Sequence, residues 1–564
     1  MEKVWYKSYT EGIHQEIDPD QYSSIADFFK KNCEKFADLK AVSNMGTSLT
    51  YRELEEKTRH FAAYLQHCLH LKKGDRLAIM MPNCLQYYLA LFGALRAGLI
   101  VVNVNPLYTP KELTNQLSDS GAESIVVMAN FGHTLEESLP NTPVKNIIVT
   151  QLGDMHGFLK GHIVNIVVKY FKRMIPSFFL PNAIEFNTVL SEGSNKVFQS
   201  VELSGSDTAF LQYTGGTTGV AKGAVLSHRN IVANTLQCLE WAKFQLTEGK
   251  EVTISPLPLY HIFSLTISCF VMIGLGAECV LITNPRDIPG FIKELKHTPF
   301  TFMISINTLC NALLHNEEFK SVDFSKLKCC ITGGMPTTKN VADQWEEVTG
   351  VAITEGYGLT ETSPVVTINS FEKRAFTGGI GYPIPSTEID VKDENGNSVP
   401  IGEVGELCVR GPQVMSEYWN MPEETAHAFF KDGWFRTGDI VRVNNEGLIF
   451  LVDRKKDMIL VSGFNVYPNE VEEVLMSHPQ ILEAAVIGVE NVEWTGEAVK
   501  AVIVRKDPSL TFEDVITFCR KQLTPYKVPH YIDFRDELPK TPVGKILRRV
   551  LREEERAKNK AKAA

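Results

Sequence analysis

A short run of glycines and threonines is the stretch of this sequence best suited to chemistry. Residues 214–219 are three threonines and three glycines, and Lys222 and Gly223 follow closely. Glycine loses too much chain entropy in a helix interior or a packed strand, and a core would have to satisfy every threonine hydroxyl. Free backbone N–H groups, hydroxyls and a lysine are what a polyphosphate requires. The run therefore predicts a phosphate-binding loop, and the apolar segments on both sides argue against a low-complexity surface loop.

The loop is not a P-loop of the Walker A type. That pattern needs Gly-Lys followed directly by Ser or Thr, whereas Lys222 lies between Ala221 and Gly223. The stretch instead resembles the phosphate-binding signature of the adenylate-forming enzymes, which include acyl-CoA synthetases, firefly-type luciferases and peptide-synthetase adenylation domains. Many members have serine where this chain has Gly215. The resemblance implies that ATP is bound by Tyr213, Thr214, Gly215, Gly216, Thr217, Thr218, Gly219 and Lys222.

Two further motifs follow in the order of that family. Thr332-Gly-Gly-Met-Pro336 resembles the segment that walls the adenine and the acyl group, with Gly334 at the nucleotide. In Glu355-Gly-Tyr-Gly-Leu-Thr-Glu361 the resemblance implies that Tyr357 lies against adenine, with Thr360 beside the nucleotide. It also implies that Glu361 holds Mg²⁺, with Thr217 near the same ion. A hard carboxylate suits Mg²⁺ that bridges phosphates.

The last part of the chain carries five residues that the resemblance assigns. Asp439 and Arg454 match residues that bind the ribose, although an aspartate beside glycine is also common in β-turns. Lys456 falls at the family's hinge. Gly463 matches a glycine past which the thiol arm of coenzyme A runs, where a side chain would obstruct. Lys545, on the proline-punctuated loop of residues 539–545, matches the catalytic lysine.

The elements that must position these residues are those of an α/β protein. Helical patterns at residues 25–36, 52–67, 86–97 and 111–121 alternate with apolar strands at 76–81, 99–104 and 124–128. This alternation predicts mainly parallel sheets covered by helices. We expect a large N-terminal body, residues 1–451, a hinge at 452–457, and a small mobile α+β lid, residues 458–564, that carries the catalytic lysine.

Composition excludes several classes of protein. The 564 residues carry a net charge of −10, which argues against nucleic acid as a partner. Eleven cysteines without CxxC spacing indicate a reducing compartment and no zinc site. The N-terminus has no apolar signal region. These features favour a cytoplasmic protein, and they leave its oligomeric state open.

Two apolar segments raise the question of a membrane. Residues 158–180 resemble a basic amphipathic helix, which would lie on the cytoplasmic face of an anionic inner membrane as a peripheral anchor or pack on its own domain. The sequence does not separate these alternatives. Residues 262–277 are apolar but too short to span a bilayer, which favours a buried helix and strand.

The resemblance covers the whole chain and is closest to the bacterial long-chain fatty acid–CoA ligases of fatty-acid degradation. It implies that ATP and a fatty acid give acyl-AMP and pyrophosphate, and that coenzyme A then gives acyl-CoA and AMP. His261 and Phe263 are candidate acyl-tunnel residues, though each could be ordinary core. An aryl-CoA ligase of the 4-coumarate type is the alternative. A peptide-synthetase unit is disfavoured because no carrier domain follows, and a non-catalytic fatty-acid-binding protein would not need Glu361, Asp439 and Lys545.

Overall fold

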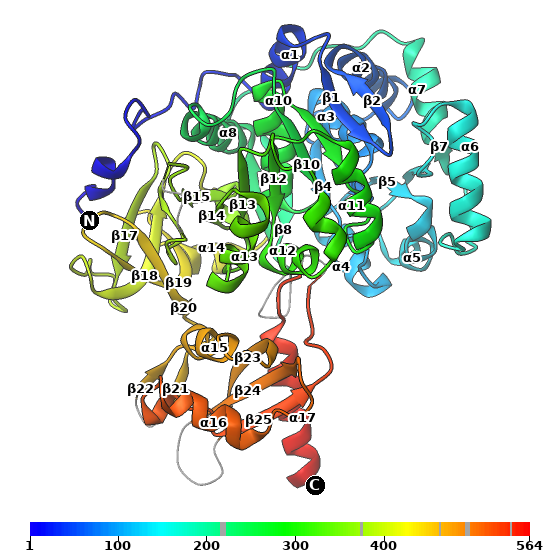
Figure 1. Ribbon diagram of the computed structural model, residues 1–564. Helices are drawn as coiled ribbons and strands as arrows, with labels where there is room; N and C mark the ends of the chain where they lie inside the picture. The colour runs from blue at the N-terminus through cyan, green and yellow to red at the C-terminus, as the bar shows by residue number, and fades with distance from the viewer. Residues whose placement is uncertain (215–220, 373–375, 462–463, 491–496, 542–543, 564) are drawn as a thin grey trace.

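The computed structural model describes residues 1–214, 221–372, 376–461, 464–490, 497–541 and 544–563. Figure 1 shows a large body and a smaller domain below it, which the chain enters after strand β20. The α/β class expected from the alternating pattern is confirmed. The body contains two large, mainly parallel sheets with helices on their faces, and the small domain is α+β.

The first large sheet leads directly to the predicted phosphate loop. Its seven strands lie in the order β7-β6-β5-β3-β4-β8-β9, parallel except for the antiparallel pair β8–β9. Their bounds are Ile184–Glu185, Asn146–Thr150, Ser124–Met128, Arg76–Met80, Ile100–Asn103, Thr208–Tyr213 and Gly223–Ser227. The predicted loop therefore connects β8 to its neighbour β9.

The second large sheet presents the other nucleotide motifs at its strand ends. Its nine strands lie in the order β16-β15-β14-β13-β12-β10-β11-β1-β2. Their bounds are Tyr382–Pro383, Val365–Ile368, Ile353–Gly358, Cys329–Thr332, Phe302–Ser305, Val252–Ser255, Glu278–Leu281, Lys40–Asn44 and Thr47–Thr50. The strands from β14 to β1 pair in parallel, so their carboxyl ends lie at one edge of the sheet. Both the 332–336 and the 355–361 motifs begin at that edge.

Helices cover both sheets. They are α1 Ile25–Lys35, α2 Tyr51–His67, α3 Leu85–Arg96, α4 Pro110–Ser120, α5 Gly132–Ser138, α6 Phe158–Ile166, α7 Phe186–Ser194, α8 His228–Ala242, α11 Ile288–His297, α12 Asn307–Leu314, α13 Lys339–Thr349 and α14 Pro422–Ala428. Ser24 caps α1, as expected, by accepting a hydrogen bond from the Asp27 backbone N–H at 3.1 Å. Every residue of α3 is buried, because this helix is apolar on all sides and packs in the interior.

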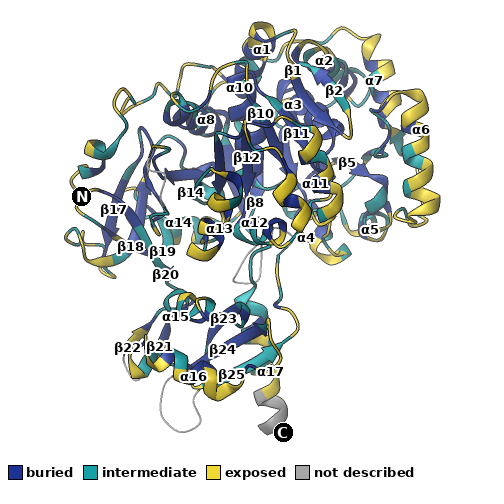
Figure 2. Ribbon diagram, in the orientation of Figure 1, coloured by how far each residue is buried: buried dark blue, intermediate teal, exposed yellow. Residues whose placement is uncertain are grey.

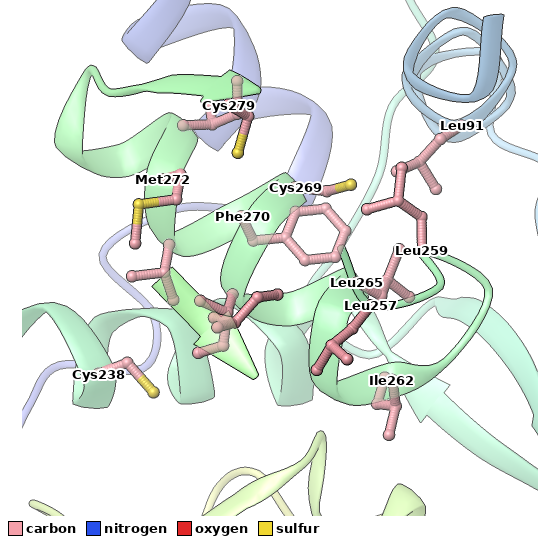
Figure 3. Close-up of a cluster of buried hydrophobic side chains, with 14 of the residues drawn as sticks. Leu91, Cys238, Leu257, Leu259, Ile262, Leu265, Cys269, Phe270, Met272 and Cys279 are labelled. Atoms are coloured by element: carbon pink, nitrogen blue, oxygen red, sulfur yellow. The ribbon is translucent and has the colours of Figure 1, made fainter. Parts of the chain in front are cut away.

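The apolar segment 262–277 is a buried helix followed by a strand, as predicted. It forms α9 Ile262–Ser264, a π-helical stretch η5 Leu265–Val271, α10 Met272–Leu275 and then β11. Figure 3 shows Phe270 of this segment among side chains from α3 and α8. None of the helices in the described part of the chain combines the length and the hydropathy that a membrane span requires.

The remaining elements form a four-stranded sheet and the small domain. The sheet is antiparallel, β17 Glu388–Lys392, β18 Val404–Arg410, β19 Phe435–Val443 and β20 Ile449–Arg454. The small domain contains β21 Ile459–Val461, β22 Phe464–Val466, α15 Pro468–Met476, β23 Ile481–Glu490, β24 Glu497–Arg505, α16 Phe512–Arg520, β25 Tyr531–Arg535 and α17 Arg548–Ala563. Its own core includes Val471, Leu475 and Ile503, so it can move as a unit.

Candidate active site

The phosphate loop is closed at its base by the strands that flank it. The Thr214 backbone N–H donates to the Lys222 carbonyl at 2.9 Å, which continues the β8–β9 ladder past Tyr213. Tyr213 donates its hydroxyl to Asp119 Oδ2 at 2.5 Å. The predicted contacts Gly215, Gly216, Thr217, Thr218 and Gly219 lie outside the described residues. Thr214 and Lys222, at the two ends of the loop, are therefore held together at the end of the β8–β9 pair.

Two residues that the motifs did not reveal lie at Lys222, and one of them, Tyr418, also contacts Glu361. Lys222 forms an ion pair with Glu424 of α14, and its Nζ lies 5.1 Å from the centre of the Tyr418 ring. Tyr418 donates its hydroxyl to Glu361 Oε1 at 2.6 Å. Burial raises the pKa of Tyr418, so this hydroxyl stays protonated and keeps donating. The sequence offered only a weak indication of these two residues, which is the aromatic pair at residues 418–419, shortly before the proline that starts α14.

The predicted ribose residues meet on neighbouring strands. Asp439 of β19 and Arg454 of β20 are register partners, and Arg454 Nε lies 3.4 Å from Asp439 Oδ1. Tyr357, at the end of β14, donates its hydroxyl to Asp439 Oδ2 at 2.6 Å. The predicted adenine and ribose residues thus share one site, although their motifs are 82 positions apart.

The segment after β13, which is the predicted wall of the nucleotide site, lies against β14: a Cβ on Gly333 would lie 3.0 Å from the Gly356 carbonyl oxygen. Gly334 has φ +78°, and a Cβ built there would meet no atom of the described residues within 4 Å. The position is exposed, so there is open space beside the backbone. Thr360 is half-buried in the short 3₁₀ turn Thr360–Thr362 that carries Glu361.

Glu355 supports this wall from below. It is buried, and its Oε1 accepts a hydrogen bond from the Thr337 backbone N–H at 3.2 Å. Its Oε2 has no hydrogen-bond partner among the described residues. Burial raises the pKa of Glu355 to about 7, so the carboxyl group is largely neutral below that pH. The sequence showed Glu355 only as the first letter of a motif.

Lys545 reaches this site from the small domain. The loop before α17 projects from the small domain to the body (Figure 1), and a Cβ on Gly544 would lie 2.6 Å from Thr308 Oγ1. Burial, and next the positive charge of Arg454, lower the pKa of Lys545 to about 7, while Asp439 opposes them. Burial lowers the pKa of His261 to about 4, and the charge of Lys545 adds to that effect. Lys545 therefore lies within electrostatic reach of Asp439, Arg454 and His261.

The candidate acyl residues lie beside the same wall. Both are half-buried, and a Cβ on Gly333 would lie 3.3 Å from Phe263 Cζ. His261 stays neutral near pH 7 because of its low pKa. Phe263 thus lies beside the predicted nucleotide wall, and His261 lies within electrostatic reach of the lysine.

The predicted hinge is held by arginines of α17. Arg548 Nη2 lies 2.6 Å from Glu472 Oε2, and its Nη1 lies 3.3 Å from Asp457 Oδ2. Arg552 Nη1 lies 2.8 Å from Asp457 Oδ1. Lys456, which precedes Asp457 in the chain, is exposed. Gly463, the predicted coenzyme A contact, lies outside the described residues.

The donor set around Glu361 fits Mg²⁺ as the family uses it. Within the described ranges there is no cluster of three side chains able to hold a metal ion. A single half-buried carboxylate is enough when the ion keeps several waters and binds phosphate oxygens, which is the usual habit of Mg²⁺. The arrangement can therefore hold a metal that arrives with a nucleotide.

The fold and this constellation correspond to a known family. The family model "AMP-binding enzyme" matches residues 29–419, and "AMP-binding enzyme C-terminal domain" matches residues 470–545. The chain belongs to the AMP-binding enzyme family.

Known proteins similar to the chain are ligases that act on acids and coenzyme A. The chain is 56% identical to a long-chain-fatty-acid–CoA ligase of Yersinia pestis, over 98% of each chain. It is 31% identical to a 4-coumarate–CoA ligase of Pinus taeda, over 92% of each chain. A crystal structure of an anthranilate CoA ligase in complex with anthranoyl-AMP superposes with a TM-score of 0.85, at 24% identity, over 96% of this chain and 100% of that one. The similarity to that structure shows that the two chains share a fold.

Proposed function

We propose that this protein is an AMP-forming long-chain fatty acid–CoA ligase that feeds fatty-acid degradation. A fatty acid and ATP give acyl-AMP and pyrophosphate, and coenzyme A then gives acyl-CoA and AMP. The observation that carries the proposal is the lysine loop against the body: a Cβ on Gly544 would lie 2.6 Å from Thr308 Oγ1, and the next residue, Lys545, is close enough to Arg454 and Asp439 for their charges to act on its pKa. The high identity to a long-chain ligase over the full chain supports the substrate class.

The first step needs positive charge around the α-phosphate. Attack by the fatty-acid carboxylate accumulates negative charge on the phosphate oxygens, and preorganised cations there are usually the largest catalytic contribution. Lys545 and Lys222 supply that charge. Glu361, together with Thr217, would hold Mg²⁺, which neutralises phosphate charge when bound. The ribose hydroxyls would donate to Asp439, whose carboxylate can accept several O–H donors, including the Tyr357 hydroxyl that it already accepts.

The second step needs a different face of the small domain. Gly463 and Lys545 belong to the same domain, yet they serve different half-reactions. We therefore propose that the domain rotates about residues 452–457 after the adenylate has formed, a hinge motion of a common kind. The lysine would leave with the lid, and the thiol arm of coenzyme A would enter along Gly463.

Pyrophosphate release across a series of acids tests this function. We expect release with palmitate to exceed release with 4-coumarate by at least about tenfold, because binding energy grows with each buried methylene. Addition of coenzyme A should convert the adenylate into thioester and AMP. Faster turnover of 4-coumarate would favour the aryl-CoA ligase, and no release with any acid would revive a non-catalytic fatty-acid-binding protein.

The free cysteines and the proposed substrate indicate where in the cell the protein acts. All eleven cysteines are free, which suits a reducing compartment. We propose that the protein acts in the cytoplasm and associates with the cytoplasmic face of the inner membrane, where a long-chain acid partitions. Its net charge of −10 disfavours nucleic acid as a partner.

A further inference from the structure

The helix that begins at Phe158 turns its large apolar side chains to solvent and not to the body. α6 continues as a π-helical turn, η4 Val167–Phe171. Its less exposed side carries Gly161 and Asn165 together with two half-buried valines, Val164 and Val168. A Cβ on Gly161 would lie 2.4 Å from the Gly153 carbonyl oxygen. Asn165 accepts a hydrogen bond from the Gly153 N–H at 2.7 Å and donates to Asp154 Oδ1 at 3.1 Å. A helix that packed in the usual way would turn its apolar side to these contacts.

The apolar side chains point to solvent instead. Phe158 is 84% exposed and Phe171 is 78% exposed, and Phe179, shortly after the helix, is 73% exposed. We call the exposed surface formed by Phe158, Leu159, Ile163, Ile166, Tyr170 and Phe171 the outer face of α6. Figure 2 shows this helix coloured as exposed along an edge of the large body, away from the small domain. Scattered single apolar residues are normal on a surface, but a contiguous strip of this kind marks an interaction site.

The same segment has a charge opposite to that of the chain. Residues 155–181 contain four basic residues and no Asp or Glu, whereas the whole chain has a net charge of −10. Lys169, Lys172 and Arg173 are exposed beside the outer face of α6. Bulky apolar groups flanked by cations are the combination that binds the interface of an anionic bilayer.

We propose that the outer face of α6 is a membrane-docking surface that inserts its phenylalanines between anionic phospholipids while Lys169, Lys172 and Arg173 contact the headgroups. A second copy of the chain is a poorer occupant, because a two-fold interface would bring these cations together with no acidic residue in the segment to pair them. The proposal rests on the proposed location at the membrane for its biological meaning, but its test needs no catalysis.

Co-sedimentation of the full chain with vesicles tests the surface. Vesicles of phosphatidylethanolamine with phosphatidylglycerol should bind the wild-type protein, and pure phosphatidylcholine should bind it weakly. The triple variant Phe158→Ser, Phe171→Ser, Phe179→Ser should lose at least about tenfold in partitioning, because each ring gives up the burial of a large apolar side chain. Phe244→Ser is the matched control, since Phe244 is 62% exposed in the turn after α8, and it should bind like the wild type.

A charge variant separates headgroup recognition from insertion. Lys169→Gln, Lys172→Gln, Arg173→Gln should reduce binding to the anionic vesicles by at least about tenfold and remove its salt dependence. Binding to phosphatidylcholine should not change. Equal loss on both kinds of vesicle would contradict the headgroup contact.

Three results would overturn the proposal. They are no binding of the wild type to anionic vesicles, undiminished binding of the serine variant, or wild-type dimers that the serine substitutions dissociate without any vesicle binding. If the triple variant does not fold, Phe171→Trp gives a second measurement. The wild type already has six tryptophans, so its emission is subtracted from that of the variant. The difference should shift to the blue and be quenched by brominated lipid; an unchanged difference would refute insertion. Pyrophosphate release with octanoate should be the same in the folded serine variant and the wild type, and its absence from both would count against the ligase and leave the docking surface standing.

Discussion

At the scale of single residues, the lysine of the small domain is the most informative group. Its low pKa of about 7 has burial as its main cause and the nearby Arg454 as the next. A bound triphosphate would supply the negative charge that this site lacks, and would stabilise the protonated lysine. The residue is therefore held where a charge is costly until a nucleotide is present.

Replacement of this lysine should separate the two half-reactions. We expect Lys545→Ala to slow adenylate formation by about 10²- to 10³-fold, the usual effect of removing one group that stabilises transition-state charge. Thioester formation from preformed acyl-adenylate should be nearly unchanged. Pyrophosphate release and thioester formation, measured separately, check this. Lys540→Ala is the control on the same loop, because Lys540 pairs with Glu483 in the small domain. If Lys545→Ala slowed both half-reactions equally, the assignment of Lys545 to the first step would be contradicted.

Glu355 should make stability depend on pH. Its native pKa of about 7 lies above the ordinary value of 4.5, so the native state binds more protons than the unfolded state between these two values. Stability from this group is present below pH 4.5 and is lost as pH rises through 7, by on the order of 3 kcal/mol. Glu355→Gln keeps an acceptor for the Thr337 N–H but cannot ionise.

The test compares both proteins by denaturant unfolding at a series of pH values. The free energy of unfolding of Glu355→Gln minus that of the wild type should increase by on the order of 3 kcal/mol as pH rises from 5 to 8. Parallel profiles for the two proteins would show that Glu355 ionises freely in the folded state.

At the scale of elements, helix α17 ties the lysine loop to the hinge. Arg548, three residues after Lys545, faces Asp453, Asp457 and Glu472. Burial raises the pKa of Asp453 to about 6, although Arg548 opposes this effect. The helix thus neutralises buried acids at the point where the two domains join.

Loss of this arginine should destabilise the small domain. Arg548→Leu leaves buried carboxylates without their cation, which typically costs about 3–5 kcal/mol. Calorimetry should show an earlier transition for the small domain while that of the body stays in place. Arg549→Leu is the matched control, because Arg549 pairs at the surface with Glu553 at 3.5 Å, and such pairs contribute at most about 1 kcal/mol. Similar effects of the two substitutions would refute the stabilising role of Arg548.

At the scale of the whole molecule, the proposed mechanism lets the orientation of the two domains decide which half-reaction is served. The lysine loop contacts the body at Thr308, and we assign this arrangement to adenylate formation. Under the same proposal, the small domain leaves that contact and returns on another face for formation of the thioester. The proposed catalytic cycle therefore depends on the hinge as much as on the site.

A rigid hinge should hold the enzyme after its first step. Proline fixes φ and removes a backbone donor, so Lys456→Pro should slow thioester formation at least about tenfold while adenylate formation is retained. Single-turnover measurements of acyl-AMP and acyl-CoA check this. Lys456→Ala controls for loss of the side chain and should behave like the wild type in both steps; a proline variant with normal thioester formation would place the hinge elsewhere.

The sequence alone was sufficient for the class of fold, and it supplied the motifs from which the candidate site is built. Apolar strands that alternate with helices predict parallel sheets because each such strand is buried on both faces. Tyr357, Asp439 and Lys545 were predicted from family motifs, and the structure brings them together. Tyr418, Glu424 and Asp119 were not predicted, because a tyrosine or an acid outside a motif looks like any surface residue until folding places it beside a partner.

What the chain determined by itself is local: a run of glycines and threonines cannot pack, and the order of its motifs indicates the chemistry. What only the tertiary structure decided is which groups meet and which face solvent. Helical spacing in residues 158–180 is the same whether the apolar side packs inward or outward, and only the contacts of Gly161 and Asn165 with the body show that it faces outward. Burial and proximity are properties of the folded chain, and they set both the pKa of Lys545 and the exposure of Phe171.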